Sequence, residues 1–392
     1  MAMALEDVRV LDLSGFIAGA YGTRILASFG AEVIMVEPVT GSFMRSIVSI
    51  EPGVLPLSSL VNHDKKSVAL NLKYKNGKDI FKELAAKADV LVETFRPGTM
   101  ATLGLDYESL RKVNPRLVYL SQTAYGQTGP YSRDIGYDGG VQATSGMHTL
   151  REHPEVAPPI FADIVSSVYG VLGVMIALLY RQKTGQGQYI DLSMNDAIFS
   201  QNYLEHLKIV WEGLPNFIID MSCHPPRCLL GSFKCKDGYV VNSFLQEKQW
   251  AAAADVIGEK QMVEDERFAN ILSRAQNDEA ASSIIEGWTS NHTRDEIVDA
   301  MVEAGVPCAK VLTLEEVEED PQLRSRDMLL ELNDPDFGKV KVVGIPFKLS
   351  ETPSIIRTPA PRLGEHTEEI LISLLGYSKE EIAKLRGHGV IA

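Results

Sequence analysis

One stretch, Ile164 to Tyr180, is almost wholly apolar and constrains the fold more than any other part of the chain. A helix formed by such a stretch must be buried on nearly every side, so we expect it to be the central helix of the molecule. Gly170, Gly173 and Ala177 recur at spacings of three and four residues, which leaves one face of this helix without bulk. Another part of the backbone is therefore expected to approach closely at that face.

The two ends of this helix carry recognisable signals. Asp163 stands immediately before it, where a carboxylate can accept hydrogen bonds from the free N–H groups of the first turn. The positive end of the helix dipole favours an ionised Asp163. Arg181 and Lys183 suit the negative end, and Gly185 predicts a left-handed C-terminus. An N-cap is the ordinary interpretation of Asp163, and catalysis is the alternative.

Size and charge limit the classes of protein that fit. A chain of 392 residues is too long for one typical core, so two domains are expected. A formal net charge of −14 argues against a nucleic-acid partner, because such binding relies on neutralising phosphates. The apolar run is broken by Ser166 and Ser167 and falls short of the ~20 residues of a membrane span, so no membrane partner is expected.

The beginning of the chain and the cysteines bear on location and metal binding. MAMALEDVRV lacks the basic start of a signal peptide, which predicts a cytoplasmic protein. Four cysteines are too few and too widely spaced for a disulfide framework. Cys223, Cys228 and Cys235, with His224 between them, match no zinc-binding spacing. We therefore expect no metal site.

Strand and helix patterns alternate along the first part of the chain. Val8 to Leu13, Ala18 to Phe29 and Ala31 to Val36 read as strand, helix and strand, which makes a βαβ unit. The alternation continues with strands at 67–72, 89–92 and 117–121, helices at 77–88 and from Asp106, and a further strand at 188–192. Repeated βα units predict the α/β class, with an open parallel sheet covered by helices on both faces.

Glycines near the first strand raise a different possibility. Gly15, Gly19 and Gly22, followed by Glu37, superficially resemble a dinucleotide site with its ribose-binding acid. The spacing G-x-x-x-G-x-x-G is not the G-x-G-x-x-G of such sites, which counts against a nicotinamide dehydrogenase. Close packing of strand against helix is the ordinary explanation for these glycines.

Ligands of open α/β sheets bind beyond the carboxyl ends of the strands. Those ends carry Lys73 and Arg96, which we expect at one rim, where together they suit phosphates. The long loop from Ser121 to Phe161 is rich in Gly, Ser, Thr, Pro and Tyr and leads directly to Asp163. A loop of this length in a compact domain is more often functional than inert.

Composition and pattern also predict the domain organisation. We expect a large domain that begins with residues 1–213, a small α+β domain at 226–315, and a return segment with C-terminal helices at 330–392. Pro and Asn mark a linker at 214–226. The hairpin at 228–243 turns at Lys236-Asp237-Gly238 and opens the small domain.

Separate blocks of the chain resemble the class III CoA-transferases, a family that includes formyl-CoA:oxalate and crotonobetainyl-CoA:carnitine CoA-transferases and α-methylacyl-CoA racemases. The likeness covers nearly the whole chain, and the order of the blocks is more specific than any one of them. The matching blocks are RVLDLSGFIAG, FGAEVIMVEP, HDKKSVALNLK, ADVLVETFRPG, LGLDYESL, NPRLVYLSQTAYGQTGPY, RQKTGQGQYIDLSMNDA, GVPCAKVLTLEEVEEDPQ and PAPRLGEHTEEIL.

The resemblance implies roles for particular residues. The nucleophilic aspartate of the family falls on Asp163, and active-site positions fall on Ile17, Tyr137 and Asp138. Contacts to CoA fall on Ala18, Leu70, Lys73, Thr94, Phe95 and Arg96. It also implies a Rossmann-like large domain formed by both chain ends, and an interlocked homodimer. CoA and acyl-CoA enter as substrates together with a small carboxylic acid, and no permanently bound cofactor is expected.

Departures from the family pattern favour some substrates and activities of the family over others. Ile17 and Pro38 replace a glutamine and an arginine of the formyl-CoA transferases, and the four-glycine loop of those enzymes is absent, which makes oxalate a poor acceptor. The stretches GSFKCKDGYVV and CAKVLT are closer to the carnitine-type transferases. Racemases of the family have a histidine where this chain has Tyr137, and a tyrosine is poorly suited to proton transfer next to a thioester. A racemase of the same fold and a non-catalytic acyl-CoA binding protein are the alternatives to a CoA-transferase.

Overall fold

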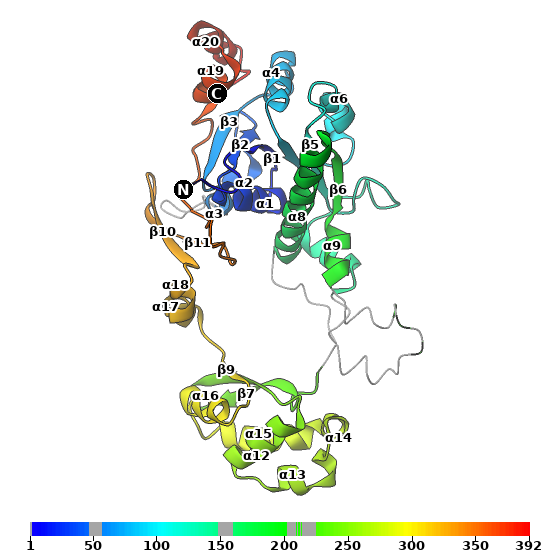
Figure 1. The fold of residues 1–392 in the computed structure, drawn as a ribbon, viewed down its shortest axis with the longest axis vertical. Helices are drawn as coiled ribbons and strands as arrows, with labels where there is room; N and C mark the ends of the chain where they lie inside the picture. Colours follow the sequence, from blue (N-terminus) through cyan, green and yellow to red (C-terminus); the bar gives the residue numbers. More distant parts are fainter. Residues whose placement is uncertain are drawn as a thin grey trace. The chain divides into compact units, whose positions relative to one another are not determined.

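The computed structural model describes residues 2–46, 57–147, 160–201, 209, 211, 213 and 225–392. The chain divides into two compact units (Figure 1). Unit 1 comprises Met1–Gln201 together with Pro321–Ala392, and unit 2 comprises Asn202–Asp320. Both ends of the chain thus belong to unit 1. Residues 214–224 of the predicted linker, Cys223 and His224 among them, lie outside the described residues.

A six-stranded parallel sheet forms the centre of unit 1, with the strand order β3-β2-β1-β4-β5-β6. Its strands are β1 (Arg9–Leu13), β2 (Glu32–Glu37), β3 (Lys65–Ala69), β4 (Val90–Glu93), β5 (Val118–Thr123) and β6 (Tyr189–Ser193). The order reverses between β1 and β4, and this switch point is where open α/β sheets bind their ligands. The predicted α/β class with an open parallel sheet is confirmed.

Helices cover both faces of this sheet (Figure 1). On one face, α1 (Ile17–Ser28) packs against α8 (Phe161–Thr184), and both contribute to one hydrophobic cluster over the sheet. The other face is covered by helices from both ends of the chain. These are α4 (Lys75–Ala86), α5 (Thr99–Leu103), α6 (Tyr107–Arg111), α19 (Thr367–Leu375) and α20 (Lys379–Gly387).

The strands of the large sheet all come from residues 9–193, and the C-terminal segment adds other elements to unit 1. Leu70 forms an isolated antiparallel bridge with Ile391, which ties the end of the chain to the segment after β3. The remaining elements of unit 1 are α2 (Phe43–Ser46), α3 (Leu57–Val61), α7 (Asp138–Thr144), α9 (Met194–Gln201), α18 (Pro321–Ser325), β10 (Leu329–Asp334) and β11 (Gly338–Val343).

Helix α8 packs closely on the sheet through its glycine face. A Cβ atom added at Gly170 would lie 3.1 Å from Leu120 Cδ2, and one at Gly173 would lie 3.4 Å from Ile190 Cγ2. The glycine face is therefore in close contact with β5 and β6, but side chains of these strands, and not another backbone as predicted, approach it. Gly185 ends the helix with a positive φ of 75°, as expected.

Two predictions about α8 are wrong. The helix is not buried on nearly every side, because Val168, Leu172, Ile176 and Leu179 are each more than half exposed. The sheet and α1 cover only part of its circumference. It is also 24 residues long and apolar enough to cross a membrane by length and composition. Its glycine face packs on a sheet, which is typical of the core helix of a soluble domain.

Unit 2 has its own hydrophobic core between a three-stranded antiparallel sheet and a layer of helices. The predicted hairpin is present as β7 and β8, and the third strand is β9. Its elements are β7 (Leu230–Cys235), β8 (Gly238–Ser243), β9 (Cys308–Lys310), α12 (Glu247–Ile257), α13 (Gln261–Glu264), the 3₁₀ helix η2 (Glu266–Phe268), α14 (Ile271–Gln276), α15 (Asp278–Thr289), α16 (Arg294–Glu303) and α17 (Leu314–Glu319). This is an α+β arrangement, as the sequence indicated.

Candidate active site

A cavity of about 710 Å³ lies beyond the carboxyl ends of the strands, at the switch point between β1 and β4. Phe16 reaches it from the β1–α1 connection and Ala18 from the first turn of α1. Thr94 follows β4, and Asp163 comes from the first turn of α8. The described residues that line it are Phe16, Ala18, Thr94, Gln122, Thr123, Ala124, Gly136, Tyr137, Asp138, Gly139, Gly140, Ala143, Ile160, Asp163 and Met194. We call it the Asp163 cavity.

Asp163 is not the N-cap of α8, contrary to the expectation from sequence. The helix begins at Phe161, and its N-cap is Ile160, which has a positive φ of 64° and makes no side-chain cap. The carboxyl of Asp138 fills that role instead, since Asp138 Oδ2 accepts a hydrogen bond of 3.1 Å from the Asp163 N–H. Asp163 therefore lies within the first turn of the helix, and no hydrogen bond from the described residues engages its carboxyl.

The prediction that Asp163 is ionised because of the helix dipole also needs correction. Its side chain is only 5% exposed. Burial, and secondarily the negative charge of Asp138, raise the pKa of Asp163 to about 7. The loss of hydration thus outweighs the dipole of the helix. Near neutral pH, Asp163 is divided between the acid and the carboxylate.

Tyr137 and Asp138 stand at the start of α7, opposite the first turn of α8. Asp138 Oδ1 accepts a hydrogen bond from Gln142 Nε2, so both carboxyl oxygens of Asp138 are engaged. Tyr137 is 71% exposed, and its ring lies over Gly140, where an added Cβ would come within 3.4 Å of the ring. Asp138 is therefore held in place, whereas the ring of Tyr137 borders the open side of the cavity.

Two serines connect the first turn of α8 to its surroundings. Ser167 Oγ lies within hydrogen-bonding distance of the carbonyl oxygens of both Asp163 and Ala18, which belong to the first turns of α8 and α1 respectively. Ser166 Oγ accepts a hydrogen bond of 2.8 Å from the buried Gln122 Nε2. These contacts hold the nucleophile candidate against α1 and the end of β5.

The structure brings five of the predicted residues together and leaves the others outside the Asp163 cavity. Ala18, Thr94, Tyr137, Asp138 and Asp163 line it. Ile17 is buried in a cluster with Ala20, Met44 and Val61, and Leu70 is buried in the core below α19 and α20. Phe95 packs against that same core, and Lys73 and Arg96 are exposed after β3 and β4.

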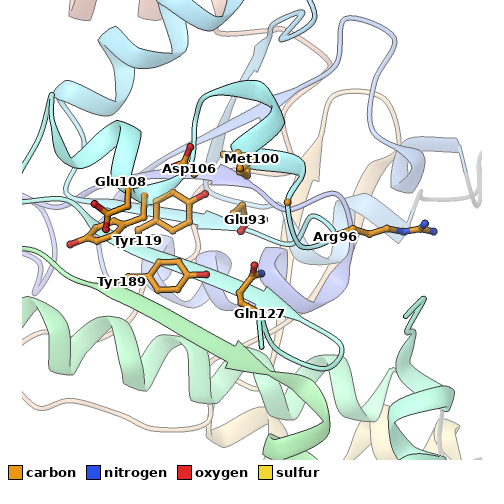
Figure 2. A pocket seen from close by; sticks show the side chains of 11 residues that line it. Glu93, Arg96, Met100, Asp106, Glu108, Tyr119, Gln127 and Tyr189 are labelled. Atoms are coloured by element: carbon orange, nitrogen blue, oxygen red, sulfur yellow. The ribbon is translucent and has the colours of Figure 1, made fainter. Parts of the chain in front are cut away.

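A second cavity, of about 270 Å³, borders Arg96 (Figure 2). Tyr119 and Tyr189 lie in it beside the carboxyl of Glu93, whose pKa is raised by burial. Its remaining lining residues are Gly98, Met100, Ala101, Asp106, Tyr107, Glu108 and Gln127. Figure 2 shows the side chain of Arg96 pointing away from the tyrosines and acids. An acidic cavity of this kind is unsuited to phosphates, so Arg96 can meet an anion only on its outer side.

Several lining residues were not predicted from the sequence. Phe16 and Gln122 to Ala124 lie directly after or at the end of β1 and β5, so their position at a strand end was the available signal. Met194, at the start of α9, carried no such signal. The part of the long loop at 148–159 lies outside the described residues.

The structure also bears on the dinucleotide-like pattern and on metal binding, two possibilities that the sequence raised. Glu37 accepts hydrogen bonds from Arg45 and Ser67, so its carboxyl is engaged inside the domain and not presented to a ribose. Added Cβ atoms would clash with Ser14 at Gly19 and press on Ser167 O at Gly22, which supports the packing explanation for these glycines. Within the described ranges, no cluster of three or more His, Cys, Asp or Glu side chains could hold a metal ion.

Known proteins resemble this chain over nearly its full length. The succinyl-CoA–L-malate CoA-transferase beta subunit of Chloroflexus aurantiacus is 33% identical, over 99% of this chain and 98% of its own. The formyl-CoA:oxalate CoA-transferase of Bradyrhizobium sp. is 32% identical, over 100% of this chain and 98% of its own. A solved structure of a CAIB/BAIF family protein from Brucella suis matches with a TM-score of 0.84 and 28% identity, over 95% of this chain and 100% of that one.

The sequence model of CoA-transferase family III matches residues 5–367. This range includes the whole sheet, the Asp163 cavity and unit 2. A match of this extent, supported by relatives named as CoA-transferases, also identifies the class of activity. The chain belongs to CoA-transferase family III and is an enzyme of that class.

Proposed function

We propose that this enzyme transfers CoA from an acyl-CoA to a carboxylic acid through a thioester formed on Asp163. A carboxylate oxygen of Asp163 attacks the thioester carbonyl, the carbon–sulfur bond breaks, and an aspartyl acyl anhydride and CoA thiolate result. The thiolate then attacks the aspartyl carbonyl and expels the donor acid, which leaves CoA bound to Asp163. The acceptor carboxylate reverses both steps and restores the Asp163 carboxylate.

The observation that carries this proposal is the buried carboxyl of Asp163 in a cavity shared with Ala18, Thr94, Tyr137 and Asp138. A carboxylate suits the role because its anhydride is reactive enough to return an acyl group to CoA. Burial suits it because water would hydrolyse that anhydride. The raised pKa of Asp163 also makes its carboxylate a more basic nucleophile than an exposed aspartate.

Donors to the developing oxyanion are available at the start of α7. No side chain caps this helix, and Gly139 and Gly140 in its first turn line the cavity. Their backbone N–H groups therefore have no partner within the helix and can donate to a substrate oxygen. The hydroxyl of Tyr137 can donate to a carboxylate or anhydride oxygen from the open side.

We place CoA across the carboxyl ends of β1, β3 and β4. Ala18 and Thr94 would contact the end of CoA that carries the thioester, and Lys73 and Arg96 would pair with phosphates at the rim. Leu70 and Phe95 would contribute through their backbone, because their side chains pack in the core. Ile17 would support the cavity from behind, since it is buried among apolar residues.

Finer features of the function are also proposals. The stretches GSFKCKDGYVV and CAKVLT favour carnitine-type substrates, and the departures at Ile17 and Pro38 count against oxalate, although relatives of oxalate and malate type are among the similar proteins. A homodimer is supported by the apolar stripe of Val168, Leu172 and Ile176 on α8, whose exposure to water is unfavourable. A cytoplasmic location without a permanent cofactor stays a prediction.

The test is incubation with an acyl-CoA and a panel of carboxylic acids, read by mass spectrometry. Transfer gives a new acyl-CoA, and trapping during turnover gives a mass increase on the peptide that contains Asp163. We expect Asp163→Ala to remain folded and to lose transfer altogether, since the covalent route is removed. Substantial transfer by folded Asp163→Ala contradicts the mechanism. Incorporation of solvent deuterium next to the thioester, without transfer, identifies a racemase instead.

A further inference from the structure

The described lining of the Asp163 cavity combines apolar surface with two acidic side chains. Six of the described lining residues are apolar, namely Phe16, Ala18, Ala124, Ala143, Ile160 and Met194. The charged residues in the described lining are Asp138 and Asp163, and both are acidic. No lysine, arginine or histidine belongs to the lining formed by residues that the structure describes.

The mouth of the cavity presents aromatic surface to water. Tyr137 is 71% exposed and Phe16 is 42% exposed, although both rings line the cavity. Phe43 stacks on Phe16, with 6.1 Å between the ring centroids, and is itself 66% exposed. A ligand that covered these rings would remove apolar area from water, which favours ligands with apolar surface of their own.

A second carboxylate on the substrate would be unfavourable in the Asp163 cavity. It would lose its hydration in the cavity, find no cation among the described lining residues, and be repelled by Asp138. An uncharged acyl group incurs none of these costs. The reacting carboxylate itself is different, because its charge is consumed in the anhydride with Asp163.

We propose that the acyl groups exchanged by this enzyme carry no second carboxylate. This inference rests on the proposed transfer through Asp163 and names its substrate class. It separates the enzyme from similar proteins whose names specify succinyl-CoA with malate, or formyl-CoA with oxalate.

Identity exchange tests the inference with each acid on its own. The full chain is incubated with butyryl-CoA and isotopically labelled butyrate, or with succinyl-CoA and labelled succinate. The label entering acyl-CoA is measured by mass spectrometry. The two acids have the same chain length, and the second carboxylate of succinate replaces a methyl group. We expect exchange of butyrate to exceed that of succinate by roughly tenfold or more in kcat/KM.

A variant with an added cation provides the matched control. Ala143 lies on α7, lines the cavity and is exposed, so a long side chain fits there. Ala143→Arg should raise succinate exchange relative to butyrate exchange, because it supplies a partner for the second carboxylate. Ala143→Met, which adds bulk without charge, should leave the preference for butyrate in place.

The outcomes separate this inference from the proposed function. Faster exchange of succinate than of butyrate by the wild type overturns the inference and leaves the transferase mechanism intact. An equal shift toward succinate in Ala143→Arg and Ala143→Met contradicts the electrostatic argument. Absence of exchange with every acid of a panel that also includes acetate, crotonate, malate and oxalate overturns the transferase proposal together with this inference.

Discussion

At the scale of single residues, the chemistry of Asp163 depends on what surrounds its carboxyl. Burial and the neighbouring Asp138 raise its pKa to about 7. The backbone N–H of Asp163 donates a hydrogen bond to Asp138. The result is a carboxyl that is basic enough to be a good nucleophile and ionises close to neutral pH.

The pH dependence of transfer follows from this pKa. In the proposed mechanism only the carboxylate of Asp163 attacks, so kcat should rise with pH through about 7 and level off above it. A rate that is flat between about pH 5 and about pH 8 would contradict the assignment. The measurement is the initial rate of acyl-CoA formation over that range, at saturating acyl-CoA.

The free energy of unfolding should fall as pH rises, whereas kcat should increase. Because the folded-state pKa of Asp163 is raised from 3.8 to about 7, its protonated form stabilises the fold below 3.8, and this contribution is lost as pH rises through about 7. Denaturant unfolding at about pH 5 and about pH 8 measures it as a loss of a few kcal/mol at most. Asp163→Ala should lose less stability over the same interval, and an identical loss in both proteins would contradict the assignment.

Arg96 tests the placement of CoA. Its guanidinium is exposed and points away from the acidic second cavity (Figure 2). Arg96→Ala should raise KM for acyl-CoA about three- to tenfold and change kcat less, because the proposed phosphate is remote from the thioester. The effect should shrink at high salt. Lys112→Ala removes another exposed cation of unit 1 as a control, and an equal KM in Arg96→Ala and wild type would refute the placement.

At the scale of elements, the cavity exists because helices approach the sheet closely. Gly170 and Gly173 bring α8 onto β5 and β6, and Gly22 faces the Ser167 carbonyl where α1 meets α8. Gly19 lies against Ser14 and Thr94 and brings α1 close to the end of β4. These contacts set the distance between Ala18, Thr94 and Asp163, so the packing of the helices and the shape of the proposed active site depend on the same glycines.

Gly19→Ala should disturb both packing and activity. An added Cβ would lie 2.4 Å from Ser14 Cβ and 2.9 Å from Thr94 Cγ2, so the backbone or Thr94 must move. We expect a loss of about 1–3 kcal/mol in the free energy of unfolding, with lower kcat/KM. Gly15→Ala is the matched control, because no atom lies within 4 Å of a Cβ there. Equal stability of the two variants in denaturant unfolding would contradict this account.

At the scale of the whole molecule, the proposed homodimer rests on the exposed apolar stripe of α8. Val168, Leu172, Ile176 and Leu179 recur at spacings of four, four and three, so they lie on one face of the helix. The described elements of the chain therefore cover only part of the apolar surface of α8. A second copy is the partner that the family resemblance implies.

The enzyme should be a dimer that persists at nanomolar concentration, since threaded subunits separate only after partial unfolding. Mass photometry or light scattering on dilution measures this, and a folded monomer would contradict it. Ile176→Lys should weaken the dimer by placing a charge in the stripe. Gln182→Lys, on an exposed position of the same helix, is the control. A normal dimer in Ile176→Lys would exclude the stripe from the interface.

The sequence by itself determined the features that depend on local pattern. Alternating strands and helices predicted the parallel sheet, Gly185 predicted the end of α8, and the ordered blocks around Asp163 indicated the CoA-transferases. Such features follow from residue spacing and backbone preferences, which act over a few neighbours.

The tertiary structure alone decided what depends on residues distant in sequence. Asp138, 25 residues before Asp163, caps α8 and raises the pKa of Asp163. Ala18 and Thr94 reach the same cavity only because β1 and β4 are neighbours at the switch point of the sheet. The stripe of α8 stays exposed because the sheet and α1 cover only part of the helix. Hydrophobicity indicates that a residue prefers burial, but burial itself, and the pKa that follows from it, depend on which elements pack around it.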